Sequence, residues 1–264
     1  MTEELQKGNL KIPVGISSCL LGERVRYDGG HKGHSYITGT LGDYFEFQPF
    51  CPEVAIGLGI PRKPIRLWRN ENKKIRCVST SNSKLDFTEQ LEDCGEAQYD
   101  WHKHLCGYIL KKDSPSCGME RVKIWDDVMP KREGVGVYAD KLIRNFPYLP
   151  VEEEGRLGDA ILRENFIQRV FAMHRWFKFV SKGLSISLLV DFHARHKLIL
   201  MSHDQTSYRE LGQLVAGTTK ESLVEDTKKY LLGFMSALKK RASRGTVSYT
   251  HLRAHETVLA LVCR

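Results

Sequence analysis

The chain has 264 residues, of which 41% are hydrophobic and 27% charged. These fractions are ordinary for a globular protein and argue against disorder, collagen-like repeats and membrane integration. The length fits two modest domains or one large one. The formal net charge is +8, and most of the basic surplus lies in residues 151–246. Such a surplus can favour an anionic partner, but its commoner meaning is a solvated helix surface.

The N-terminal residues and the cysteine count predict a cytoplasmic protein without a membrane partner. Residues 1–7 are polar and acidic and lack the apolar core of a signal peptide. No apolar run approaches the roughly 20 residues that a membrane helix needs. The seven cysteines are odd in number and scattered, which disfavours a disulfide framework. The roles that remain for these cysteines are metal ligation, nucleophilic chemistry or plain burial.

Strand-like and helical segments alternate over about residues 10–150 and predict an α/β domain. The expected architecture is a Rossmann-like sheet with flanking helices. Apolar or alternating patterns predict strands at 12–19, 45–50 and 107–110, and a hairpin formed by 65–68 and 74–78. Helical spacing predicts helices over 88–105 and 135–146.

The pattern changes at 150–155 and becomes helical, which predicts an all-α second domain over residues 150–246. Helices are expected from Leu157 onward, including 184–196, 208–216 and 223–238. Residues 247–264 bear no relation to this pattern and resemble the translation of a sequencing adaptor. We therefore expect them to be foreign sequence, with the helical domain truncated near residue 246.

Three cysteines share a setting at the predicted end of a strand. Cys19 and Cys51 follow the first and second strands, and Cys117 lies in the turn-rich loop after 107–110. Ligands gather at the carboxyl ends of parallel strands, so these residues can converge. Three thiolates suit a soft metal or an iron–sulfur cluster and leave one coordination position open. Without a compact Cys-x-x-Cys pair, context alone leaves ligand and buried thiol as equal alternatives. The remaining cysteines beside apolar stretches are predicted core thiols: Cys77, Cys94 and Cys106.

The segments around these three cysteines resemble the thiouracil desulfurase family, long catalogued as uncharacterised domain family 523. The resemblance covers about residues 12–148 and predicts a desulfurase-like domain over 10–149. Its blocks occur in order at 17–22, 25–29, 51–53, 57–62 and 112–118. Residues 149–157 and 163–166 resemble the uncharacterised helical domain 1722, which often follows this family.

The resemblance implies a [4Fe-4S] cluster held by Cys19, Cys51 and Cys117. The implied activity is non-redox removal of sulfur from 2-thiouracil or a related thiolated base, a small thiolated pyrimidine. In the family mechanism the open iron of the three-Cys cluster captures the thiocarbonyl sulfur, and a water activated by a carboxylate attacks the carbon. A soft sulfur donor prefers iron to a hard cation, which agrees with this chemistry.

Four residues of these blocks are candidate catalytic groups. Glu53, two residues after Cys51, is the first candidate for the general base, and the alternative is a carboxylate near a helix end. Ser114 and Ser116 can orient the base or substrate, or serve only the turn between them. Asp28 can bind the pyrimidine edge, or simply form a turn. Nearby cations could hold the sulfide anion or close ion pairs around the site: Arg24, Arg26, Arg62 and Lys112.

Two other functions stay open. The basic helical half could bind nucleic acid such as tRNA, in a protein without desulfurase activity, although no recognised nucleic-acid module is present. A structural zinc site could instead use the same three cysteines and one further ligand.

Overall fold

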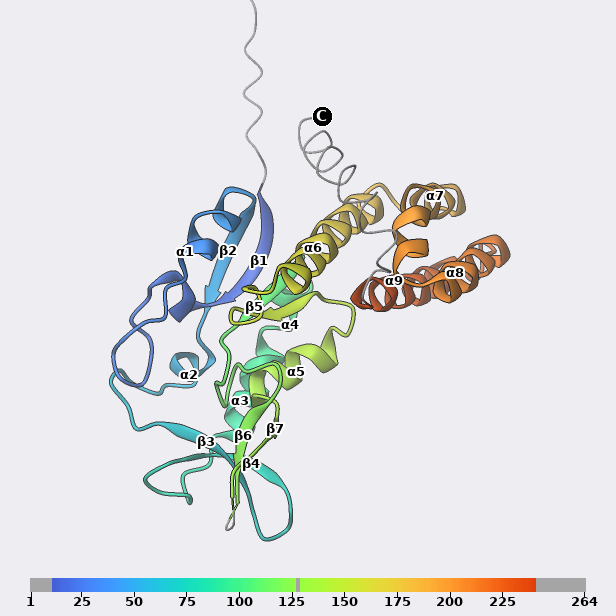
Figure 1. The fold of residues 1–264 in the computed structure, drawn as a ribbon. Coiled ribbons are helices and arrows are strands. Elements are labelled where there is room, and N and C mark those ends of the chain that lie inside the picture. Colours follow the sequence, from blue (N-terminus) through green and yellow to red (C-terminus); the bar gives the residue numbers. More distant parts are fainter. Residues whose placement is uncertain (1–10, 127–128, 241–264) are drawn as a thin grey trace, which may run out of the picture. The chain divides into compact units, whose positions relative to one another are not determined.

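A computed structural model describes residues 11–126 and 129–240, and the chain forms two compact units, Met1–Phe166 and Ile167–Arg264. The first unit holds two β-sheets with flanking helices, and the described part of the second is helical (Figure 1). The structure confirms the predicted order along the chain, an α/β region followed by an all-α region. Within the described ranges, no helix is long and apolar enough to cross a membrane.

The first sheet is parallel and has the strand order β2-β1-β5-β8. Its strands are β1 (Ile12–Ser17), β2 (Phe45–Phe50), β5 (Gly107–Leu110) and β8 (Val151–Glu153). β1 is central, and its register places Ser17 beside Phe50 and Ile16 beside Ile109. The carboxyl ends of β1, β2 and β5 therefore meet at one edge of the sheet. β8 follows the predicted domain boundary at residue 149, and that boundary stays a prediction.

Three short helical segments connect β1 to β2, and a fourth follows β2. They are η1 (Ser18–Leu21), α1 (Ser35–Thr38), η2 (Leu41–Asp43) and α2 (Pro52–Ala55). Cys19 lies in η1, and Cys51 is the residue immediately before α2.

The second sheet is mixed, with the order β4-β3-β6-β7, and only half of it was predicted. Its strands are β3 (Ile65–Arg69), β4 (Ile75–Ser79), β6 (Val122–Trp125) and β7 (Lys131–Gly134). β3 and β4 form the predicted antiparallel hairpin. The first three residues of β7 are charged and exposed, so no hydrophobic pattern in the sequence predicts this strand.

Helices of the first unit pack between its sheets. They are α3 (Thr88–Ala97), α4 (Tyr99–His102) and α5 (Val137–Asn145), so the single helix predicted over 88–105 is interrupted at Gln98. α5 places Tyr138 and Leu142 in a core with β5 and β8. α3 places Leu91 in a second core with β3, β4 and β6. α3 and α5 also contact each other.

Long amphipathic helices build the second half of the described chain. They are α6 (Ala160–Val180), α7 (Ile186–His203), α8 (Gln205–Gly217) and α9 (Leu223–Lys239). Aromatic side chains fill their core, with Trp176 stacked on Tyr230 and edge-on to Phe192. Side-chain caps fix two helix starts: Ser185 accepts the N–H of Leu188, and Asp204 accepts that of Thr206. The expectation for residues 247–264 lies outside the described residues.

Candidate functional site

The carboxyl edge of the first sheet brings the three predicted cysteine ligands together. Cys19 follows β1, Cys51 follows β2, and Cys117 lies in the loop after β5. The three strands are adjacent and parallel, so each cysteine leaves the sheet at the same edge. A negative charge on Cys51 would raise the pKa of both Cys19 and Cys117, so Cys51 lies within electrostatic reach of both thiols. None of the three forms a disulfide.

Burial governs the chemistry of these thiols. Cys19 and Cys117 are buried, and Cys51 is partly exposed. Burial raises the pKa of the Cys19 thiol to about 11, and it also raises the pKa of Cys51 and of Cys117. Thiolates at this edge therefore need a compensating cation, and a bound metal supplies one. The donor set of three soft sulfur atoms fits an iron–sulfur cluster.

Among the described residues, no three His, Cys, Asp or Glu side chains lie close enough together to hold one metal ion. That finding concerns ligands that share a single ion. The three cysteines of an open [4Fe-4S] cluster each bind a different iron atom, so their sulfur atoms stand farther apart than the ligands of one ion.

Glu53 is held at the same edge by an ion pair and a hydroxyl. Its carboxylate Oε2 accepts hydrogen bonds from Arg62 Nε at 3.1 Å and Nη2 at 2.8 Å. The two side chains are only 14% and 7% exposed, so the guanidinium compensates a carboxylate that is largely out of water. The other oxygen, Oε1, accepts the hydroxyl of Ser116 at 2.7 Å. Arg62, one of the cations noted in the sequence, thus positions the candidate base.

The two predicted serines form a chain of hydroxyl groups that ends at Glu53. Ser116 donates to the carboxylate, so the 2.9 Å contact between Ser114 and Ser116 must be donated by Ser114. Ser114 Oγ also accepts the backbone N–H of Cys117 at 3.1 Å. The turn role and the site role proposed for Ser114 are therefore compatible, because one hydroxyl shapes the loop and continues the chain.

The start of α5 fixes the loop that carries Cys117. Gly136 N donates to the Gly118 carbonyl at 2.7 Å, and Ala139 N donates to the Ser116 carbonyl at 3.1 Å. A Cβ atom on Gly136 would lie 2.6 Å from the Ser116 carbonyl oxygen and 2.7 Å from the Cys117 nitrogen. Only glycine permits this close approach, so the loop is held by backbone contacts and leaves its side chains to the site.

Asp28 lies in its own turn, apart from the contacts that join Glu53 to the serines. Its carboxylate accepts the Gly30 N–H at 3.0 Å and stands 3.4 Å from Arg26 Nε, with 47% of the side chain exposed. The Gly30 N–H lowers the pKa of Asp28. A role of Asp28 at a pyrimidine edge stays a prediction.

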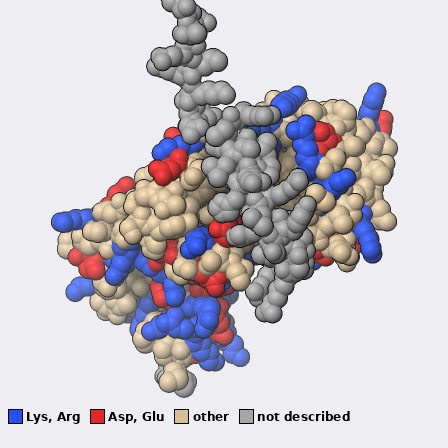
Figure 2. All heavy atoms as spheres, turned by 45° about the horizontal axis from the view of Figure 1, so that its top comes forward, with Lys and Arg blue, Asp and Glu red and all other residues tan. Residues whose placement is uncertain are grey.

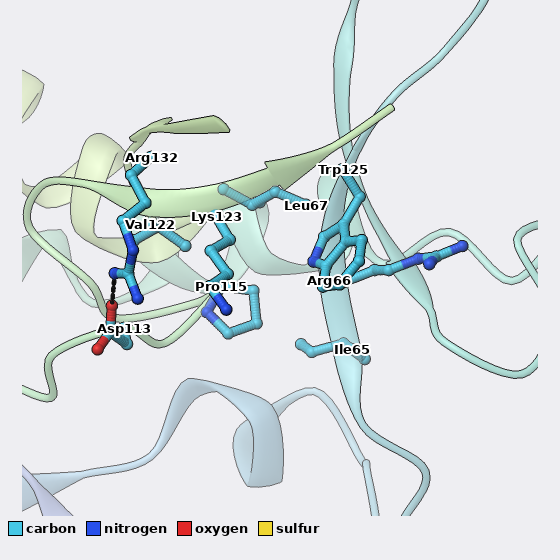
Figure 3. Close-up of a pocket in the computed structure, with 9 residues that line it drawn as sticks. All are labelled: Ile65, Arg66, Leu67, Asp113, Pro115, Val122, Lys123, Trp125 and Arg132. Atoms are coloured by element: carbon cyan, nitrogen blue, oxygen red, sulfur yellow. Dashed lines mark hydrogen bonds and ion pairs between the residues drawn. The ribbon is translucent and has the colours of Figure 1, made fainter. Parts of the chain in front are cut away.

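The cysteine loop also borders a cavity of about 250 Å³. Figure 3 shows Asp113 and Pro115 of this loop facing Lys123 and Arg132 of the second sheet, with Arg132 paired to Asp113 at 2.7 Å. Trp125 and Arg66 line its other side (Figure 3). The cavity is therefore basic and partly aromatic, and it lies beside the loop that carries Cys117.

Sequence reasoning missed two residues beside the thiols, Ser17 and Lys111. The hydroxyl of Ser17 accepts the Lys111 N–H at 3.0 Å. The Lys111 ammonium pairs with Glu154, and its charge lowers the pKa of Cys19 against the larger opposing effect of burial. Lys111 and Glu154 are 43 positions apart in the chain, so no local sequence pattern predicts their ion pair.

Comparisons with known proteins identify the family of the first part of the chain. The family described as 2-thiouracil desulfurase matches residues 14–154, and DUF1722, a protein family of unknown function, matches residues 197–255. The first match covers more than half of the chain, so this chain belongs to the 2-thiouracil desulfurase family.

Individual relatives match parts of the chain. The uncharacterized protein YbbK of Bacillus subtilis (strain 168) is 28% identical over 153 residues, which are 55% of this chain and 98% of YbbK. The uncharacterized protein YbgA of Escherichia coli (strain K12) is 42% identical over 48 residues, 18% of this chain, and the match spans only 28% of YbgA. A solved structure of the [4Fe-4S]-dependent thiouracil desulfidase TudS is 32% identical and covers 56% of this chain and 94% of its own, with a TM-score of 0.45.

Proposed function

We propose that this chain is an iron–sulfur-dependent enzyme that removes sulfur from 2-thiouracil or a related thiolated base without net redox change. One observation carries the proposal: three cysteines leave adjacent parallel strands at one edge, where Ser116 joins the Cys117 loop to the Glu53 carboxylate. Membership of the 2-thiouracil desulfurase family and the similarity to TudS, which is [4Fe-4S]-dependent, support it.

Cys19, Cys51 and Cys117 would hold the cluster. When bound, a [4Fe-4S] cluster with three cysteine ligands supplies one iron without a protein ligand, a soft Lewis acid suited to a thiocarbonyl sulfur. Cys51 is partly exposed, so this edge is open to solvent at one of its three thiols.

Glu53 is the proposed general base. Water adds its oxygen to the thiocarbonyl carbon, the carbon–sulfur bond breaks, and sulfide leaves, so a C=S group becomes C=O and no electrons are gained or lost. Glu53 Oε1 would take the proton that the attacking water loses. Arg62 holds the other carboxylate oxygen in place, and Ser116, with its hydroxyl on Oε1, orients the base.

Uracil release by anaerobically reconstituted protein tests this function. We expect conversion of 2-thiouracil into uracil and sulfide in equal amounts without added reductant. Glu53→Gln should keep the brown cluster colour and lose about 10²- to 10⁴-fold in kcat, as expected for a lost general base. Glu89→Gln, an exposed partner of Arg76 on the second sheet, is the matched control. A wild-type protein that stays colourless and takes up only zinc contradicts the proposal.

A second candidate function, binding of nucleic acid, is favoured by the outward face of the second sheet. Arg66 lies over the rings of Trp68 at 4.8 Å and Trp125 at 5.8 Å, and the two tryptophans are neighbours in register. Lys123 is exposed on the same face and forms no ion pair with a described residue. Blue Lys and Arg spheres gather at this end of the first unit in Figure 2. Interleaved cations and aromatic rings suit contacts with phosphates and stacked bases.

Binding of a labelled single-stranded RNA at varied salt tests this second candidate. Lys123→Glu should weaken binding and make it less salt-dependent, whereas Lys178→Glu in the helical half should leave it unchanged. If Lys178→Glu weakens binding and Lys123→Glu does not, the binding surface lies on the basic helical half instead. No binding by wild type at low salt dismisses the nucleic-acid function.

A further inference from the structure

Three consecutive glutamates, Glu152, Glu153 and Glu154, stand at the end of β8, and the proposed function uses none of them. Glu152 and Glu153 are only 3% and 2% exposed, which is rare for a glutamate without a compensating partner. β8 pairs with β5 in parallel, so its carboxyl end lies at the edge of the sheet that carries the cysteines. The fourth strand of the sheet therefore brings carboxylates to this edge.

Glu154 holds the start of the segment that leads from β5 to Cys117. Its Oε1 pairs with the Lys111 ammonium, and its Oε2 accepts the Lys112 N–H at 2.7 Å. The side chains of Lys111 and Glu154 are only 16% and 12% exposed, so this ion pair lies largely out of water. The backbone N–H of Glu154 also donates to the Leu110 carbonyl at 3.2 Å. Residues 111 and 112 are thus tied to the end of β8 by a charge and by the backbone.

Glu153 holds the other end of the same segment. Its Oε1 accepts the backbone N–H of Met119, two residues after Cys117, at 2.8 Å. The next residue, Glu120, forms an ion pair with Arg156, which follows β8 in the chain. The end of β8 therefore contacts the chain both before and after Cys117.

We propose that Glu153 and Glu154 are positioning residues that clamp the Cys117 loop at both ends, and the consequence for a cluster rests on the proposed function. The loop, residues 111–119, contains no helix or strand, so its position depends on contacts with its surroundings. Contacts that orient a metal ligand also limit its movement away from the metal. A clamped Cys117 therefore opens to solvent less often and retains its iron longer.

Alkylation of individual cysteines in the iron-free full chain measures this clamp directly. Iodoacetamide labels Cys117 only when the loop opens, and peptide mass spectrometry gives its rate. Cys77, fully buried in the second sheet, reports opening of the whole unit in the same sample. The variants are Glu153→Ala and Glu154→Ala. Asp226→Ala, at a buried carboxylate of α9 in the helical half, is the matched control.

We expect Glu153→Ala and Glu154→Ala to raise the labelling rate of Cys117 about three- to tenfold, which corresponds to one lost hydrogen bond. The rate of Cys77 should stay as in wild type, and Asp226→Ala should change neither rate. An unchanged Cys117 rate would overturn the clamp. Equal increases at Cys117 and Cys77 would also overturn it, because they would show that the carboxylates only stabilise the fold.

The glutamine variants separate the hydrogen bonds from the charge. Glu153→Gln keeps an oxygen that can accept the Met119 N–H, so its Cys117 labelling should return close to the wild-type rate. Glu154→Gln keeps the acceptor for Lys112 but loses the ion pair with Lys111, so we expect only partial recovery. A Glu153→Gln variant as reactive as Glu153→Ala would contradict the Met119 contact as the origin of the clamp.

Release of iron to a chelator from the reconstituted protein extends the test to the cluster. Glu153→Ala and Glu154→Ala should lose iron faster than wild type, by factors that follow their Cys117 labelling rates. Labelling that changes without a change in iron release would overturn the consequence for the cluster. A wild-type protein that takes up no iron overturns the proposed function instead, and the labelling rates alone then decide the clamp.

Discussion

In the first sheet, β1, β2 and β5 each end before a segment that carries a cysteine, whereas Cys77 of the second sheet lies within β4 and is fully buried. Neighbouring parallel strands end at one edge, so the residues after them meet. In the second sheet, antiparallel neighbours send their ends to opposite edges. The comparison teaches that position relative to a strand end, and not residue type, separates a candidate ligand from a core thiol.

The largest effect should come from exchanging one cysteine of each sheet for alanine. Cys117→Ala should lose the brown absorbance and uracil release, because it removes one of the three proposed cluster ligands. Cys77→Ala opens a small cavity in the second core and should lower stability while keeping cluster and turnover. Absorbance and uracil release after anaerobic reconstitution measure both. Equal loss of absorbance and uracil release in the two variants would contradict the proposed difference between the sheets.

A smaller effect is expected from the serines. Ser116→Ala removes the hydroxyl on Glu53 Oε1 and should lower kcat about tenfold, the effect of one hydrogen bond to a charged group. Ser79, a buried serine of β4, contacts Ser81 at 3.0 Å, and Ser79→Ala should leave kcat unchanged. Steady-state kinetics with 2-thiouracil measure the kcat of both variants. An unchanged kcat in Ser116→Ala would show that this residue has no role in the site.

Two closely packed glycines, one beside the Cys117 loop and one in the second core, permit a further comparison. A Cβ on Gly136 meets the Cys117 loop, and a Cβ on Gly134 lies 2.8 Å from Ile124 and 2.9 Å from Leu67 in the second core. Both alanine variants should lose about 1–3 kcal/mol of unfolding free energy through overpacking. Only Gly136→Ala should also lower kcat. A Gly134→Ala variant that impairs turnover as much would show that the second sheet, too, fixes the site.

The smallest effect concerns pH and a buried histidine of the first unit. Burial lowers the pKa of His102 to about 4, and its Nε2 contacts Tyr138 Oη at 2.6 Å. Between that pH and about 6.5 the unfolded chain binds a proton that the native His102 does not, so the unfolding free energy falls as pH falls through this window.

Urea unfolding at pH 7 and pH 5 measures this loss. His102→Gln should show a smaller difference between the two pH values than wild type. The difference should persist in part, because burial also lowers the pKa of His196 in the helical half to about 4. An unchanged pH dependence in His102→Gln would show that this histidine is protonated equally in both states.

Three strands of the first sheet were predictable because they are apolar or alternating and end in recognisable turns, whereas β8 (Val-Glu-Glu) was not predicted. The segments 12–19, 45–50 and 107–110 correspond to β1, β2 and β5, and the hairpin to β3 and β4. β6 and β7 were missed although they are no shorter than β5: β5 is buried at all four residues, whereas β6 is buried at two and β7 at one. β6 pairs with β3 and with β7.

The candidate site was predictable in its residue types but not in its contacts. Glu53 and Ser116 are 63 residues apart, and only the shared sheet edge brings them together at 2.7 Å. The partnership of Arg62 with Glu53 and the position of Ser17 depend equally on tertiary structure. Motifs indicated which residues to consider, and the parallel register of β1 with β2 and β5 explains why they meet.

The central claim is that Cys19, Cys51 and Cys117 hold a cluster with one iron left open for the substrate. Mössbauer spectroscopy of the ⁵⁷Fe-reconstituted protein with and without 2-thiouracil tests it most directly. We predict about four iron atoms per chain and one iron signal, distinct from the others, that changes when 2-thiouracil is added. A protein without iron, or a cluster whose iron signals do not respond to 2-thiouracil, would contradict the account.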